Sequence, residues 1–259
     1  MELRNKVAVI TGGASGIGAA SCRAFAAEGA RVVVADRDEK GARAIADEIG
    51  GLAVAGDVGR EADVRSLVEA ATKAYGPVDV FFSNAGLLGG GGPLEASLEV
   101  WQQQWDVHVM AHVYAVRAVL PSMLERGSGY LIHTASMAGI LTSHGACAYA
   151  VTKHAAVGLA EWLSVTYHDR GIRTSLLAPL GVRTPLLGDT NSPFARLAAG
   201  PIREPAEVAQ MVVDAVRAER FLILTDPLAQ KWMEQKTLDL ERWLQGMRRL
   251  QARIEQETA

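Results

Sequence analysis

The first two-thirds of the chain alternates short apolar runs with longer segments of helical periodicity, and few folds accept that order. The apolar runs, bounded by Gly, Asp, Asn, Ser or Pro, are Val7–Ile10, Val32–Ala35, Leu52–Ala55, Val78–Phe82, Tyr130–His133 and Ser175–Ala178. The helical segments between them, with charged outer faces, are Ala19–Glu28, Glu39–Ile49, Glu61–Tyr75, Leu98–Arg126 and Tyr149–Arg170. Continuous apolar runs predict strands covered on both faces, and strand–helix–strand order predicts right-handed crossovers. We therefore expect an α/β fold with one doubly wound parallel sheet and helices on both faces.

The length and charge of the chain fit a single domain over residues 1–259, with a helical C-terminal extension at 227–259. The net charge of −3 gives no broad basic surface, so we expect no nucleic-acid partner. The most apolar stretch, Ala135–Leu163, is too interrupted to span a bilayer. Two cysteines far apart in sequence, and a start without the apolar region of a signal peptide, favour a cytoplasmic protein. The Gly- and Pro-rich stretch Gly181–Pro205 is expected to be a mobile loop over a pocket.

A glycine-rich turn follows the first apolar run, where residues 11–18 read TGGASGIG. Glycines allow a tight turn and a close approach of the backbone to a pyrophosphate at the N-terminus of the next helix, where free N–H groups favour anions. Asp36 ends the second run, 20 positions after Gly16, and can accept a hydrogen bond from a ribose 2′-hydroxyl. Each feature alone also suits an ordinary turn. In this order they predict a dinucleotide site.

Ser136, Tyr149 and Lys153 form a second constellation. Tyr149 and Lys153 lie four residues apart at the start of an apolar helix, so they share one face, and Ser136 follows the fifth apolar run. A tyrosine with a pKa near 10 must be brought toward neutrality to act as an acid–base catalyst, and we expect the Lys153 ammonium to lower the pKa of Tyr149. The spacing alone is also common for a surface tyrosine and lysine.

Taken together, these motifs resemble those of the short-chain dehydrogenase/reductase family, over nearly the whole chain to about residue 225. TGGASGIG resembles the family's cofactor loop, Asp57-Val58 the pair that holds adenine, and SNAG at 83–86 the sheet-core motif usually written NNAG. Ser136 with YAVTK at 149–153 resembles the catalytic motif, and PLGVRT at 179–184 resembles the segment that closes over nicotinamide.

The resemblance implies a Rossmann-type fold and an NAD(P)-dependent oxidoreductase that transfers a hydride between nicotinamide and a ketone or secondary alcohol. Tyr149 would be the general acid/base, Ser136 the anchor of the substrate carbonyl, and Lys153 the ribose ligand and pKa depressor. Ser136 and Tyr149 would therefore also bind substrate. The implied cofactor-binding residues are Gly12, Ser15, Gly16, Ile17, Gly18, Asp36, Arg37, Asp57, Val58, Asn84, Ala85, Gly86, Tyr149, Lys153, Pro179, Gly181, Val182 and Thr184.

Three departures from the family pattern stand out: Ser83 for a common Asn, a charged helical tail after Phe221–Pro227, and His108 for the usual catalytic Asn. The family's Asn is thought to hold a water of the proton relay behind the lysine. Neutral imidazole also offers one donor and one acceptor, so we expect His108 to be catalytic and to add an acid limb below about pH 6. The alternative is a catalytically weak or inactive NAD-binding regulator. His108 and His112 are one turn apart, but no acidic ligand accompanies them, so we predict no metal site.

We expect NAD rather than NADP, because Asp36 would repel a 2′-phosphate. Arg37, directly after it, can pair with that phosphate and keeps NADP open. Apolar residues in segments that flank the family's cleft favour an apolar ketone or alcohol, although half of them could simply cover core. They are Leu87, Leu88, Met137, Ile140, Leu141, Leu180, Leu186, Leu187 and Phe194. Polar contacts could come from His144, Arg183 and Arg196.

The tail from Pro227 is expected to form one or two helices. Trp243, Met247, Leu250 and Ile254 recur at helical spacing and form one apolar stripe. We expect this stripe to contact a neighbouring subunit, with its own sheet as the alternative. The family resemblance implies a homotetramer, or a homodimer.

Overall fold

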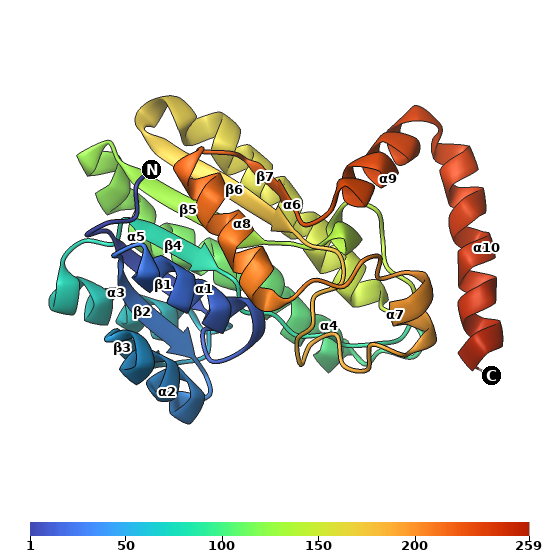
Figure 1. Ribbon diagram of the computed structural model, residues 1–259, viewed down its shortest axis with the longest axis horizontal. Helices are drawn as coiled ribbons and strands as arrows, with labels where there is room; N and C mark the ends of the chain where they lie inside the picture. Colours follow the sequence, from blue (N-terminus) through green and yellow to red (C-terminus); the bar gives the residue numbers. More distant parts are fainter. Residues whose placement is uncertain (259) are drawn as a thin grey trace.

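Seven strands form one sheet in the computed structural model, which describes residues 1–258 (Figure 1). They are β1 (Val7–Thr11), β2 (Arg31–Asp36), β3 (Leu52–Ala55), β4 (Val80–Ser83), β5 (Gly129–Thr134), β6 (Ile172–Ala178) and β7 (Leu222–Leu224). Their order is β3-β2-β1-β4-β5-β6-β7, and all neighbouring strands are parallel. The predicted doubly wound parallel sheet is confirmed. The short edge strand β7 was not predicted from the sequence.

Helices connect the strands and cover both faces of the sheet. They are α1 (Gly16–Ala27), α2 (Glu39–Ile49), α3 (Glu61–Tyr75), α4 (Leu98–Trp105), α5 (Ala111–Arg126), α6 (Cys147–Tyr167), α7 (Pro193–Leu197), α8 (Pro205–Arg217), α9 (Pro227–Leu238) and α10 (Leu240–Thr258). A π-helical turn, η1 (Asp106–Met110), joins α4 to α5, and short 3₁₀ turns occur at η2 (Met137–Gly139) and η3 (His168–Arg170). The two-helix tail is confirmed up to residue 258; Ala259, the last residue of the predicted extension, lies outside the described residues. Helix α8 was not predicted.

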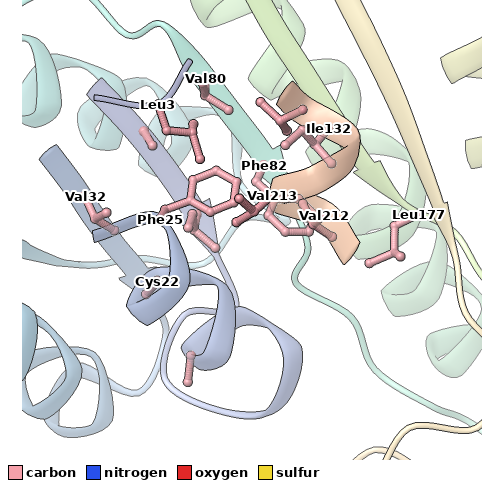
Figure 2. Close-up of a cluster of buried hydrophobic side chains, with 14 of the residues drawn as sticks. Leu3, Cys22, Phe25, Val32, Val80, Phe82, Ile132, Leu177, Val212 and Val213 are labelled. Atoms are coloured by element: carbon pink, nitrogen blue, oxygen red, sulfur yellow. The ribbon is translucent and has the colours of Figure 1, made fainter. Parts of the chain in front are cut away.

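The two faces of the sheet carry separate apolar layers because successive strand residues point in opposite directions. In β1, Ala8 and Ile10 join the layer under α1 and α8, whereas Val7 and Val9 join the layer under α3 and α5. Figure 2 shows the first layer, in which Phe25 of α1 lies beside Phe82 of β4. This arrangement explains why the strands are apolar on both faces.

The helical stretch Leu98–Arg126 is long and apolar enough to cross a membrane by length and composition alone. In the fold, however, half of its most apolar window is buried. Val119 and Met123 pack in the layer between α5 and the sheet. The stretch therefore serves here as a helix of the core.

The chain reverses its direction of travel across the sheet between β1 and β4, which are neighbours. In open parallel sheets, the crevice at the carboxyl ends of such a pair is where ligands bind. The glycine loop follows β1, Asn84–Gly86 follows β4, Ser136 follows β5 and Pro179 follows β6. The topology therefore brings motifs far apart in sequence to one edge.

Candidate active site

A cavity of about 1100 Å³ runs along the carboxyl edge of the sheet, and the predicted site residues gather around it. Every residue predicted to bind the cofactor lines this cavity except Gly18. Ser136 lines it as well. Gly18 and His108 are both buried, and they lie behind the lining rather than in it.

The glycine loop presents backbone, not side chains, to the cavity. Gly12 and Gly16 have φ angles of 67° and 51°, a left-handed conformation that favours glycine. A Cβ on Gly18 would lie 1.9 Å from the carbonyl oxygen of Gly12, so this glycine lets α1 pack directly under the loop. A Cβ on Gly16 would lie 2.9 Å from Cγ2 of Thr184, which closes the other side of the cradle. The N–H groups at the start of α1 thus face a bare surface that fits a pyrophosphate.

Asp36 is held in place at the end of β2 by two backbone donors. Its Oδ2 accepts a hydrogen bond from the N–H of Ala14 at 3.0 Å, and its Oδ1 accepts one from Asp38 at 3.0 Å. Each carboxylate oxygen can accept more than one hydrogen bond, so the Asp36 carboxylate is held in orientation and can still accept hydrogen bonds from a ligand. Asp36 and Arg37 both line the cavity, as do Asp57 and Val58. This end of the cavity fits a ribose and an adenine.

Asn84 ties three strands together beneath the middle of the cavity. Its Nδ2 donates to the carbonyl oxygen of Thr11 at 3.0 Å, and its Oδ1 accepts from Thr134 at 3.2 Å. The Thr11 hydroxyl in turn accepts from the N–H groups of Asn84 and Ala85 at 2.9 and 3.1 Å. The SNAG segment is therefore a fixed floor rather than a flexible loop.

Ser136, Tyr149 and Lys153 meet because η2 packs closely on α6. A Cβ on Gly139 of η2 would lie 2.4 Å from the carbonyl oxygen of Lys153, so only glycine allows this approach. The Ser136 hydroxyl accepts from the N–H of Ala138 at 3.1 Å, which leaves its own proton free to donate. The Lys153 Nζ donates to the carbonyl oxygen of Thr134 at 2.9 Å and lies 5.6 Å from the centre of the Tyr149 ring.

The protonation of Tyr149 differs from the sequence-based expectation. Burial raises the pKa of Tyr149, and a hydrogen bond with Ser136 opposes that rise only in part. Burial also lowers the pKa of Lys153 to about 7, because its ammonium lies in the protein interior. The lysine alone therefore does not lower the pKa of the phenol. A further positive charge placed beside Tyr149 would favour the phenolate.

Comparison with known proteins assigns this arrangement to a family. The model of the short chain dehydrogenase family matches residues 6–193, more than half of the chain. The chain belongs to the short-chain dehydrogenase/reductase family. The predicted resemblance is confirmed.

Individual members of the family are similar over most of their length. The chain is 39% identical over 235 residues to 1-deoxy-11-beta-hydroxypentalenate dehydrogenase of Streptomyces exfoliatus, covering 87% of this chain and 85% of that protein. It is 34% identical to the cyclohexanol dehydrogenase of Acinetobacter sp. strain SE19, covering 82% and 87%. A crystal structure of a short-chain dehydrogenase/reductase from Burkholderia phymatum, in complex with NAD, has a TM-score of 0.85 and 31% identity, covering 93% and 96%.

His108 occupies the position where this short-chain dehydrogenase/reductase departs from the usual Asn. Its Nε2 accepts from the N–H of Leu87 at 3.2 Å, and its Nδ1 lies 2.9 Å from the hydroxyl of Thr152. Because the Thr152 hydroxyl donates to the carbonyl oxygen of Ala148, His108 is the donor at Nδ1 and is neutral. Burial, and then Lys153, lower the pKa of His108 well below its ordinary value.

These contacts correct the expectation that a His108 nitrogen holds a relay water, since both nitrogens are already bonded within the protein. The imidazole instead packs edge-on against the Tyr149 ring, with centroids 5.4 Å apart. His108 therefore links Leu87, directly after the SNAG segment, to Thr152 of α6 and positions the tyrosine.

The far part of the cavity is apolar, and most of the apolar residues expected there line it. They are Leu87, Leu88, Met137, Leu141, Leu180, Leu186, Leu187 and Phe194. Ile140 packs beside the cavity instead, in the apolar cluster around Met137. Of the three expected polar residues only His144 lines it, because Arg183 pairs with Glu204 at 2.7 Å and Arg196 pairs with Glu257.

The apolar stripe of the tail lies against its own chain. Trp243, Met247 and Leu250 line the cavity. The expected contact with a neighbouring subunit stays a prediction. The stripe is visible in the sequence but its contact with the cavity is not, because periodicity shows which face of a helix is covered and not what covers it. Arg242 and Arg249 line the cavity beside the stripe and were not predicted as site residues.

Proposed function

We propose that the protein is an NAD-dependent dehydrogenase that interconverts a ring secondary alcohol and its ketone on a substrate with a large apolar body. The observation that carries the proposal is the convergence of Ser136, Tyr149 and Lys153 in a cavity whose remaining walls are mostly apolar, with leucine the most frequent residue. Two relatives support the substrate class, since one is named for cyclohexanol and the other for a hydroxypentalenate.

In this proposal the residues of the chain handle the proton and hold the reacting oxygen. Ser136 donates a hydrogen bond to the substrate oxygen and keeps its proton, and Tyr149 accepts the hydroxyl proton during oxidation or returns it during reduction. Bound nicotinamide supplies the hydride acceptor and, when oxidised, the positive charge that the buried phenol lacks. The Lys153 ammonium, anchored on Thr134, stays close enough to favour the phenolate. His108 keeps the tyrosine ring in place.

The proposed cofactor is NAD rather than NADP. Asp36 is fixed by Ala14 and Asp38, so it cannot easily turn away from a 2′-phosphate, whose two negative charges it would repel. Arg37 also lines the cavity and is the residue that would favour NADP. The B. phymatum structure, similar over 93% of this chain, contains NAD.

The test combines turnover with cofactor binding. Purified protein is assayed with NAD and NADP against ring secondary alcohols, and Tyr149→Phe is compared with Tyr167→Phe, which changes a tyrosine at the other end of α6. We expect Y149F to lower kcat/KM by about 100-fold or more while NADH binding persists, because only the proton acceptor is lost. Binding of NADH without turnover of any alcohol by the wild type would favour the regulator instead.

A homo-oligomer is also proposed, through neighbouring faces of α4 and α6. Large apolar side chains are exposed there, among them Trp105, Trp162 and Val165, the last of which is 86% exposed. Exposed apolar residues of this size on neighbouring helices favour a contact surface. W162E/V165E should shift the protein to smaller species in light scattering, and an unchanged mass would contradict this interface.

A further inference from the structure

Helix α10 is the outermost element of the molecule and forms a wall of the substrate cavity. Figure 1 shows it well apart from α6, at the end of the molecule opposite α2. Its main contacts are with α7 and α9, and none of its described residues is buried. Trp243, Met247 and Leu250 nevertheless face the cavity, together with Gly246. The apolar side of α10 therefore covers the space where a substrate would lie.

Polar contacts hold the tail in this position. His144 Nδ1 lies 2.7 Å from Oε1 of Gln251, and Arg196 of α7 pairs with Glu257. On α9, Lys236 donates to the carbonyl oxygen of Ile140, just after η2. The tail is thus attached both to the segment that follows Ser136 and to the loop that follows β6.

Two arginines on α10, Arg242 and Arg249, also line the cavity. They are seven residues apart, which is two helical turns, so they lie on the same edge of the helix. Nη2 of Arg249 lies 4.0 Å from the position of a Cβ on Gly246, so this guanidinium folds back over the cavity-facing side.

The charge of these arginines is not neutralised by a partner within the described part of the chain. Over residues 1–258, neither side chain has a hydrogen-bond or ion-pair partner, whereas Arg183, Arg196 and Arg203 nearby all pair with carboxylates. The acid that lines this part of the cavity is Asp239, whose Oδ1 accepts from the backbone N–H of Arg242 at 3.0 Å. Two guanidinium groups against one carboxylate leave this wall of the cavity positive.

We propose that Arg242 and Arg249 form an anion-binding subsite that selects alcohols carrying a carboxylate remote from the reacting carbon. The inference rests on the proposed function and names the substrate class of that same site, an apolar ring hydroxy acid. Ser136 and Tyr149 take the hydroxyl end, the apolar stripe of α10 packs on the rings, and the guanidinium groups bind the carboxylate through paired N–H donors. An apolar wall with two cationic side chains at its edge suits a ring hydroxy acid better than it suits a neutral ring alcohol.

The experiment compares each acid with its methyl ester, which differs only in charge at the remote end. The probes are 4-hydroxycyclohexanecarboxylate, 4′-hydroxybicyclohexyl-4-carboxylate and their methyl esters, with cyclohexanol as a small neutral reference. We expect wild-type protein to prefer the longer acid over its ester by about 10- to 100-fold in kcat/KM, as charge-assisted hydrogen bonds allow. R242Q/R249Q should abolish that preference, mainly through KM for the acid, and the methyl ester measured with the same variant serves as the reference for any loss of activity that does not depend on the carboxylate.

The control variant K231Q/R248Q removes two exposed charges that do not line the cavity and should keep the preference. Equal kcat/KM for acid and ester, or an unchanged preference in R242Q/R249Q, overturns the subsite. Failure to oxidise any alcohol overturns the proposed function instead. In that case calorimetric titration of the same acid and ester still decides the subsite, since tighter binding of the acid that R242Q/R249Q removes supports it and equal binding refutes it.

Discussion

Two histidines buried in the core, His112 of α5 and His133 of β5, should make the fold sensitive to acid. Their Nδ1 atoms lie 3.1 Å apart, and each side chain is at most 1% exposed. A hydrogen bond between two ring nitrogens needs one donor and one acceptor, so at least one ring is neutral. In the described part of the chain, neither Nε2 has a hydrogen-bond partner that would stabilise a second proton.

Burial lowers the pKa of His133 to about 4 and, together with the neighbouring His133, lowers the pKa of His112 well below its ordinary value. The unfolded chain, with a histidine pKa of about 6.5, therefore binds more protons than the folded chain below that pH. The contribution of the two neutral histidines to the free energy of unfolding is therefore present above about pH 6.5 and is lost as the pH falls toward 4. For His133 alone, linkage gives a loss of about 2 kcal/mol at pH 5 and about 3 kcal/mol at pH 4.

The assay is urea unfolding of wild type and H112L/H133L at pH 7.5, 6 and 5. Replacing both partners by apolar groups of similar size should change the free energy of unfolding little at pH 7.5. At pH 5 the double variant should be the more stable by at least about 2 kcal/mol, the contribution of His133 alone, because the unfavourable protonation of both histidines has been removed. His168→Gln, which changes an exposed histidine, should show the same pH dependence of the free energy of unfolding as the wild type. Parallel pH dependence of wild type and double variant would refute the reasoning.

Three further predictions concern the site. His108→Asn should keep at least about a tenth of the wild-type kcat/KM, with the same acid limb between pH 5.5 and 7, because the pKa of His108 already lies well below 6.5. Asp36→Ser should raise kcat/KM with NADP, relative to kcat/KM with NAD, by about tenfold or more, because the charge that repels the 2′-phosphate is removed. Gly246→Leu should lower kcat/KM for the bicyclohexyl ester by about tenfold without affecting cyclohexanol, because the new side chain enters the cavity from α10.

Each of these has a control and a contradicting outcome. His108→Leu, which cannot accept from Leu87, should lose far more activity than His108→Asn; equal losses would remove the positioning role. An unchanged cofactor ratio in Asp36→Ser would shift the discrimination to Arg37. For Gly246→Leu, an unchanged or higher Tm excludes unfolding as the cause, since glycine is the weaker helix former. Equal losses of kcat/KM for the bicyclohexyl ester and for cyclohexanol would contradict the claim that α10 forms a wall of the substrate cavity.

The order of elements and the cofactor side of the site could be predicted because both depend on local sequence. Strands covered on both faces must be apolar throughout, as in Val32–Ala35, so the parallel sheet is visible in the sequence. The glycines at 12, 16 and 18 are required by backbone conformation or close approach, so residue type alone reveals the cradle. Strand β7 is only three residues long and gives no comparable signal.

Features that depend on contacts between distant segments could not be predicted. His112 and His133 are 21 residues apart on different elements, and only the packing of α5 on β5 brings their rings together. The role of His108 was misjudged for the same reason, since Leu87 and Thr152 occupy its nitrogens. Burial likewise reverses the expected direction of the Tyr149 pKa, because desolvation outweighs the opposing hydrogen bond with Ser136.

The boundary of the family match separates two contributions to the site. Residues 6–193 contain the glycine loop, the SNAG floor, Ser136, Tyr149 and Lys153, which hold a cofactor and move a proton. Helices α9 and α10 lie beyond that match, yet they supply a large part of the cavity wall. Changes in the tail can therefore alter which alcohol fits without disturbing the groups that react. Exchange of residues 227–258 for the tail of another member should thus change the substrate preference and leave the Tyr149-dependent step intact.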